Sequence, residues 1–259
     1  MASSILIQMM GGFTVTVDGV STDWLPVKTP KGVSLIELLV LHRDEIVTRR
    51  RLCRELWGGE AGPECNAALK TLVCRTRQHL NQVSEGLGDC IATARSGYRW
   101  QDLPGVAIDV VEVQALCAAL KLPMEPERRM TLTRRLVACY RGDLFLNGLL
   151  DSGASLSAWL HREYMDAIEQ CLRALRTAND PLTTCEITAA AIRVDSLDER
   201  VSASRIRAFL ALNRPLEARM EYLRVVQAHR RELGSQPSAE LVHLDRAIAE
   251  VERRRAGTQ

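Results

Sequence analysis

The chain has 259 residues, of which 46% are hydrophobic and 25% charged, and its formal net charge is +2 at pH 7. This composition indicates a globular protein long enough for two domains and excludes a generic polycation, so any binding to nucleic acid needs a local basic patch. No run of about 18 apolar residues could span a membrane, and residues 1–10 lack the basic region of a signal peptide. We therefore expect a cytoplasmic protein without a membrane partner.

Eight cysteines lie at positions 53, 65, 74, 90, 117, 139, 171 and 185. No two form a CxxC pair, and the five histidines show no ligand spacing relative to them, so we expect no metal site and no cofactor. Most of the cysteines fall on predicted helices, where cysteine packs as a small hydrophobe. Scattered cysteines without a framework indicate a reducing cytoplasm.

The first 60 residues predict short strands followed by two helices. The strands are expected at residues 5–7, 13–17 and 45–47, and the helices at 29–42 and 49–57. Asp18-Gly19 is a turn pair between extended segments, and Thr48 is expected to cap the second helix.

Residues 63–80 predict a third helix, because residues 69, 72, 73, 76, 80 and 83 form an apolar or semi-apolar row at helical spacing. The opposite face carries Asn66, Ala67, Lys70, Cys74, Arg77 and Asn81, flanked by Thr71, Arg75 and Gln78. Readout of the DNA major groove uses such a mixture of cations, amides and small side chains. A solvated face on an ordinary amphipathic helix explains this helix by itself equally well.

The segment from 90 to 100 predicts a hairpin around Ser96-Gly97, so the order is strands, three helices and a hairpin. That order is the succession of an α+β winged helix-turn-helix with an additional N-terminal sheet. We predict a first domain over residues 1–104, an all-helical second domain over 105–255 and a disordered tail at 256–259. The helices of the second domain are expected at 109–121, 126–140, 155–178, 181–193, 198–212, 215–232 and 237–255. A loose period near 34 residues indicates a tetratricopeptide-like helical solenoid.

These halves, in this order, resemble the Streptomyces antibiotic regulatory protein family, which joins an OmpR-type winged helix to a bacterial transcriptional activation domain. The stretches that carry the resemblance are Met10 to Val15, Thr48 to Trp57, Leu69 to Arg77, Gly97 to Trp100, Tyr140 to Leu146, Trp159 to Glu163, Asp195 to Glu199 and Leu233 to Ser238. Together they span nearly the whole chain. Ala68 and Thr76 depart from the residues that are usual in the family's recognition helix, which puts the DNA sequence preference in question.

The resemblance implies a DNA-binding activator that is not an enzyme. Its partners would be the direct repeats of double-stranded promoter DNA, RNA polymerase through the sigma factor or other subunits, and a second copy in a homodimer. By position, the implied DNA-binding residues are Thr48, Arg49, Asn66, Lys70, Thr71, Arg75, Arg77, Thr93 and Arg95. An alternative is a tetratricopeptide-like interaction adaptor whose winged helix binds a protein partner. An enzyme is disfavoured, because the sequence shows no paired-carboxylate, nucleophile or phosphate-cradling motif.

Overall fold

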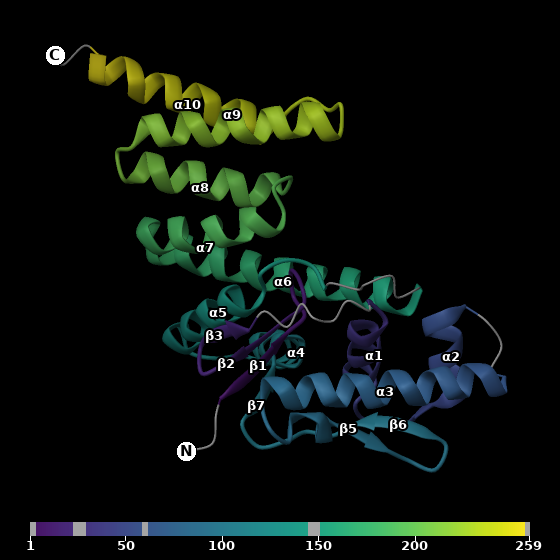
Figure 1. Ribbon diagram of the computed structural model, residues 1–259. Coiled ribbons are helices and arrows are strands. Elements are labelled where there is room, and N and C mark those ends of the chain that lie inside the picture. The colour runs from purple at the N-terminus through teal and green to yellow at the C-terminus, as the bar shows by residue number, and fades with distance from the viewer. Residues whose placement is uncertain (1–3, 23–29, 59–61, 145–150, 257–259) are drawn as a thin grey trace. The chain divides into compact units, whose positions relative to one another are not determined.

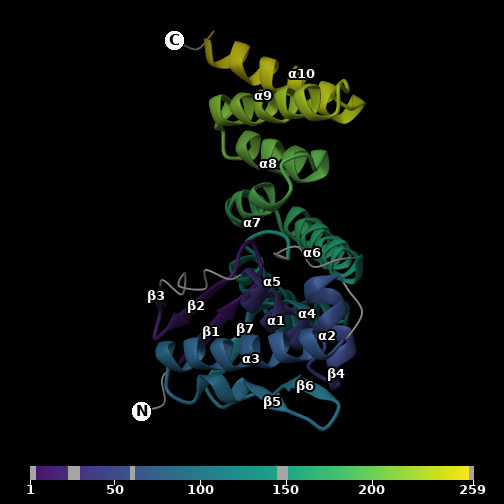
Figure 2. The same cartoon turned by 45° about the vertical axis from the view of Figure 1, so that its right-hand side comes forward.

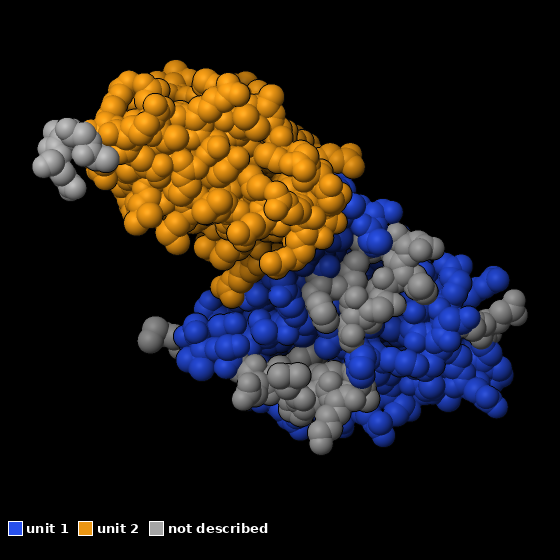
Figure 3. Space-filling model, turned by 90° about the horizontal axis from the view of Figure 1, so that it is seen from above, with its two compact units in different colours: residues 1–112, 143–160 blue, residues 113–142, 161–259 orange. Residues whose placement is uncertain are grey.

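The computed structural model describes residues 4–22, 30–58, 62–144 and 151–256. The chain forms two compact units, one of residues 1–112 and 143–160 and the other of residues 113–142 and 161–259 (Figure 3). The first unit therefore extends beyond the predicted boundary at residue 104. The physical reason is that the strand after that boundary pairs with the first strand of the chain.

The N-terminal sheet has four strands in the order β3-β2-β1-β7. Their bounds are Ile5–Gln8 for β1, Thr14–Val17 for β2, Val20–Thr22 for β3 and Val106–Ile108 for β7. The hairpin between β2 and β3 turns at Asp18 and Gly19, whose φ angles of 50° and 81° are both in the left-handed region. Positive φ at both central residues gives the twist that a two-residue hairpin needs, as the Asp-Gly pair predicted.

A buried carboxylate holds the end of this sheet together. Asp109, the first residue of α4 (Asp109–Leu120), is 3% exposed. Its two oxygens accept hydrogen bonds from the backbone amides of Met9, at 2.8 and 2.9 Å, and of Met10, at 2.9 Å. A carboxylate can accept several such bonds at once, so Asp109 satisfies amides that the sheet leaves without a strand partner.

The predicted winged helix-turn-helix is confirmed in unit 1 (Figure 1). Its helices are α1 (Pro30–Leu41), α2 (Arg49–Trp57) and α3 (Pro63–Val83), and its sheet has the order β4-β6-β5, with β4 at Val47–Thr48, β5 at Ile91–Thr93 and β6 at Gly97–Trp100. The short 3-10 helix Leu87–Cys90 precedes β5. Five of the six residues in the predicted row on α3 are buried, and the sixth, Val83, is half-buried. The row thus fixes which face of α3 is left for solvent or a partner.

Gly97 is required where β4 and β6 meet. A Cβ atom at this position would lie 2.0 Å from the backbone oxygen of Val47, which is a hard clash with main chain. The glycine therefore lets the two strands of the wing sheet approach to hydrogen-bonding distance.

The remaining helices (Figure 2), apart from residues 151–160, which belong to unit 1, form unit 2 with the later part of α4. Most start and end within a few residues of the predicted positions. They are α5 (Pro126–Cys139), α6 (Asp151–Ala178), α7 (Pro181–Val194), α8 (Glu199–Ala211), α9 (Pro215–Glu232) and α10 (Ala239–Ala256). Helix α6 begins four residues earlier than predicted, and α10 continues to residue 256, the first residue of the predicted tail. The other tail residues, 257–259, lie outside the described part of the chain.

The 34-residue period reappears as a repeated turn geometry. Asn179 and Asn213, which are 34 positions apart, both adopt left-handed backbone conformations, with φ of 51° and 54°. Each is followed two residues later by the proline that starts the next helix, at Pro181 and Pro215. Asparagine tolerates positive φ and proline suits the first helical turn, so both copies break and restart the chain in the same way. This confirms the repeated helical unit expected for the second domain.

Candidate nucleic-acid interface

Two positively charged side chains lie on the solvent-facing side of α3. The side chains of Lys70 and Arg75 are exposed, and within the described residues neither makes a hydrogen bond or an ion pair. Thr71, Cys74 and Gln78 lie exposed beside them. The hydroxyl of Thr71 donates to the backbone oxygen of Ala67 at 3.1 Å, one turn earlier on its own helix. The face therefore offers free positive charge and small or amide side chains, as the sequence predicted.

Asn66 lies near the start of α3 and is half-buried. Its amide oxygen is inaccessible to solvent and accepts no hydrogen bond from the described residues. Because this oxygen is shielded from solvent, only the NH₂ group of the amide is left to contact a binding partner.

Arg77 lies at the edge of this face and is hydrogen-bonded to the wing, the hairpin formed by β5 and β6. Its Nε and Nη2 atoms donate to the backbone oxygen of Ile91, the former at 2.9 Å, and Nη2 donates to Oγ1 of Thr93 at 2.8 Å. The guanidinium thus bridges α3 and β5. Its side chain is half-buried, unlike that of Arg75. The geometry gives Arg77 a positioning part in the interface, which the helical spacing alone did not reveal.

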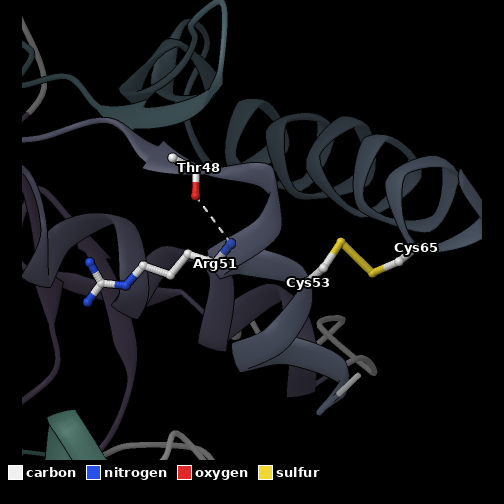
Figure 4. Close-up of a disulfide and its surroundings, with 4 residues drawn as sticks. All are labelled: Thr48, Arg51, Cys53 and Cys65. Carbon is white, nitrogen blue, oxygen red and sulfur yellow. Dashed lines mark hydrogen bonds between the residues drawn. A yellow bond between two sulfur atoms is a disulfide. The ribbon is translucent and has the colours of Figure 1, made fainter. Parts of the chain in front are cut away.

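Thr48 and Arg49 position the start of α2 against the same wing. Oγ1 of Thr48 accepts a hydrogen bond from the backbone amide of Arg51 at 3.3 Å, which caps α2 as predicted (Figure 4). The Nη1 atom of Arg49 donates to the backbone oxygen of Arg95 at 2.7 Å, and its guanidinium lies 5.8 Å from the centre of the Tyr98 ring. Arg49 therefore holds the wing turn from the α2 side.

The wing itself presents further cations. Arg95, at the turn between β5 and β6, is exposed, and its side chain has no partner among the described residues. Arg99 on β6 and Arg50 on α2 are exposed and equally unpaired within the part of the chain that the structure describes. Arg50 and Arg99 are not among the DNA-binding residues predicted from the sequence. The alternation of β6, in which Arg99 is the exposed residue between buried Tyr98 and Trp100, could have identified the latter.

The charge of this region differs from that of the whole chain. Residues 48–100 contain nine Lys and Arg and five Asp and Glu, a net charge of +4, whereas the complete chain carries +2. The basic charge is therefore concentrated in α2, α3 and the wing, as binding to a polyanion through a local patch requires.

A disulfide joins α2 to α3, which the sequence did not predict. Cys53 and Cys65 are bonded to each other, with their Cα atoms 6.1 Å apart (Figure 4). The two residues are 12 positions apart, so no short sequence motif indicated that they would form a disulfide. They meet because α2 and α3 pack against each other. The expectation of scattered cysteines without any framework is therefore wrong for this pair, while the six other cysteines form no disulfide within the described residues.

The described residues provide neither a cluster of metal ligands nor a helix that could span a membrane. No group of three or more His, Cys, Asp or Glu side chains within those residues is arranged to hold a metal ion. Among the described helices, none combines the length and the apolar character needed to cross a bilayer.

Both halves of the chain match families of known proteins. Residues 27–100 match the family described as "Transcriptional regulatory protein, C terminal", and residues 108–249 match the "Bacterial transcriptional activator domain" family. Among solved structures, "Mycobacterium tuberculosis EmbR in complex with low affinity phosphopeptide" matches with a TM-score of 0.60 and 20% identity. The match covers 96% of this chain and 66% of the EmbR chain, and at this identity it shows the fold alone. A search of curated protein sequences found no match.

The second family alone covers more than half of the chain, and the first matches the winged helix with its basic face. The chain therefore belongs to the bacterial transcriptional activator domain family, and the winged helix before this domain gives it the two-domain arrangement of the transcription regulators of the Streptomyces antibiotic regulatory protein family.

Proposed function

We propose that this regulator is a cytoplasmic activator that binds direct repeats in promoter DNA as a homodimer and recruits RNA polymerase. The observation that carries the DNA-binding part is the pair of exposed cations on α3, Lys70 and Arg75, next to a wing that carries the exposed cation Arg95; none of these side chains has a partner among the described residues. In this arrangement α3 would enter the major groove, and the wing would reach the adjacent minor groove. Arg95 suits the negative potential of a narrow minor groove.

We propose a DNA contact for each of the predicted DNA-binding residues. Lys70, Thr71 and Arg75 would contact base edges or phosphates, and Asn66, near the start of α3, would contact the DNA through its amide NH₂ group, which can donate to a base edge or a phosphate. Thr48, Arg49, Arg77, Thr93 and Arg95 would contact the sugar-phosphate backbone or the minor groove. For Arg49 and Arg77 the hydrogen bonds to the wing add a positioning part, because they hold α2, α3 and the wing in one arrangement.

Selection from a random library of DNA duplexes tests the DNA-binding part. The purified chain is expected to enrich a short element that occurs twice in the same orientation, with centres about one helical turn, or 10–11 base pairs, apart. Affinity for the enriched duplex should fall as salt rises, because phosphate contacts release counterions. Lys70→Ala should weaken binding, whereas Arg231→Ala, at an exposed position on α9 in unit 2, is the matched control. Failure to enrich any element would refute sequence-specific binding, and enrichment of a single copy would refute binding to repeats.

Transcription in a purified system tests the activator part. With RNA polymerase and a promoter that carries the enriched element, adding the chain should raise transcript yield. A decrease would indicate repression by occlusion, and no change despite occupied DNA would refute recruitment.

An interaction adaptor is the second candidate, and an apolar row on α9 favours it. Leu216, Met220 and Leu223 lie at helical spacing and are 67%, 63% and 46% exposed. Such a row is a candidate protein contact in the helical domain. The adaptor reading predicts that the chain captures a protein partner but leaves the migration of every duplex unchanged, so the DNA selection described above separates the two.

A further inference from the structure

The start of α3 lacks the apolar contacts that hold the rest of the helix. Within residues 63–68 no apolar side chain is buried, and the first buried side chain of α3 is that of Leu69. The N-cap residue, Gly62, provides no side-chain hydrogen bond to the helix. A first turn without a cap and without buried apolar side chains frays easily.

The disulfide links this first turn of α3 covalently to α2. Cys65 lies in the first turn of α3 and is half-buried, whereas Cys53 is fully buried in α2 between Leu52 and Leu56. The bond therefore fastens a turn that has little packing of its own to a helix that is anchored in the core. Asn66 follows Cys65 directly, and Lys70 and Thr71 lie within the next two turns, so the tied segment carries the first part of the proposed DNA-reading face.

We propose that Cys53 and Cys65 form a reversible oxidative modification site, in which the disulfide orders the first turns of α3 and thereby raises affinity for DNA. This inference rests on the proposed DNA-binding function. Reducing compartments keep thiols reduced, and disulfides that do form there are usually transient and redox-sensing. The dithiol would therefore be the resting form, and the bonded form would mark oxidising conditions.

The oxidant is a low-molecular-weight disulfide, such as oxidised glutathione. The thiolate of the accessible Cys65 attacks one sulfur of the oxidant, which forms a mixed disulfide and releases one thiol. The thiolate of Cys53 then attacks Sγ of Cys65, which forms the bond seen in Figure 4 and releases the second thiol. The two protons and two electrons lost by the protein are gained by the oxidant, so the step balances.

Cys90 and Cys117 are poorly suited to the first step of this exchange, the attack on the external oxidant, whereas Cys53 reacts only in the second step, with the neighbouring Cys65. Burial and the nearby Asp102 and Asp89 raise the pKa of the Cys90 thiol to about 12, and burial raises the pKa of the Cys117 thiol to about 11. Both remain thiols at neutral pH. Cys74, by contrast, is exposed on α3, so an experiment has to separate its oxidation from that of the pair.

The test compares the affinity of the full chain for the selected duplex after oxidation by oxidised glutathione and after reduction by excess dithiol. Mass spectrometry of tryptic fragments monitors the bond, because the disulfide links the peptides of residues 52–54 and 55–70. We expect the oxidised form to bind about tenfold more tightly, which corresponds to about 1.4 kcal/mol of ordering no longer required on binding. Cys65→Ser should bind like the reduced chain under both conditions, and Cys185→Ser, on α7, should keep the full response.

Every outcome decides the inference. Equal affinities with the bond shown present in one sample and absent in the other would overturn it and leave the proposed DNA-binding function intact. A redox response that persists in Cys65→Ser would assign the effect to Cys74 or another cysteine and overturn it as well. Absence of the linked peptides after oxidation would show that the pair is not a modification site. Failure of both forms to bind any duplex would overturn the DNA-binding proposal and this inference with it.

Discussion

Two arginines separated by one residue on α3 should fail in different ways when they are changed to alanine. The side chain of Arg75 is exposed and unpaired within the described residues, so Arg75→Ala should leave the free energy of unfolding unchanged within about 0.5 kcal/mol. If Arg75 contacts a base edge, the same change should weaken DNA binding by about 1–3 kcal/mol.

Arg77→Ala removes the bridge between α3 and β5. Two of its hydrogen bonds share the backbone oxygen of Ile91, and the third goes to Oγ1 of Thr93. We count these as two acceptors, one of them the oxygen of a buried residue. Hydrogen bonds from a charged donor contribute about 1.5–3 kcal/mol, so a loss of about 2 kcal/mol of unfolding free energy is expected. DNA affinity should fall too, because the wing loses its tie to α3.

Urea unfolding and DNA titration on the same preparations distinguish the two arginines. A double-mutant cycle of Arg77→Ala with Thr93→Ala should give a coupling energy of about 0.5 kcal/mol or more, since the residues are in direct contact. An Arg77→Ala variant as stable as the parent, or an Arg75→Ala variant destabilised as much as Arg77→Ala, would contradict the bridging part assigned to Arg77.

Three further outcomes follow from unit 1. Gly97→Ala should destabilise the fold by about 3 kcal/mol in urea unfolding, because the added Cβ meets a backbone oxygen of β4. Asp109→Asn should cost about 2 kcal/mol in the same assay, because an amide NH₂ replaces a carboxylate oxygen facing backbone amides; an unchanged midpoint would contradict this. Burial and the adjacent Arg51 lower the pKa of His42, so its neutral form favours the fold. The stabilisation by neutral His42 is complete above the pKa of His42 in the unfolded chain, near 6.5, and is lost as the pH falls through its lower pKa in the folded chain. The free energy of unfolding should therefore decrease between about pH 7 and pH 5, and His42→Gln should remove this decrease.

Local patterns in the sequence predict the elements, their order and most of the solvent face of α3. Apolar spacing predicted the buried row from Leu69 to Leu80, the Asp18-Gly19 pair predicted its hairpin, and Thr48 predicted the cap of α2. These features depend on interactions between residues close together in the chain, so local patterns are sufficient to find them.

Which side chains of this face are bound to other elements depends on how distant segments pack against one another. Spacing places Arg75 and Arg77 on neighbouring parts of one helix, but only the position of β5 shows that Arg77 is bound to Ile91. Likewise, Cys53 and Cys65 share no motif and meet only because α2 packs on α3. Strand β7 joins the first sheet by pairing with β1, about 100 residues earlier in the chain. Contacts between distant segments depend on how the elements pack in three dimensions, and periodicity along one element carries no information about its neighbour.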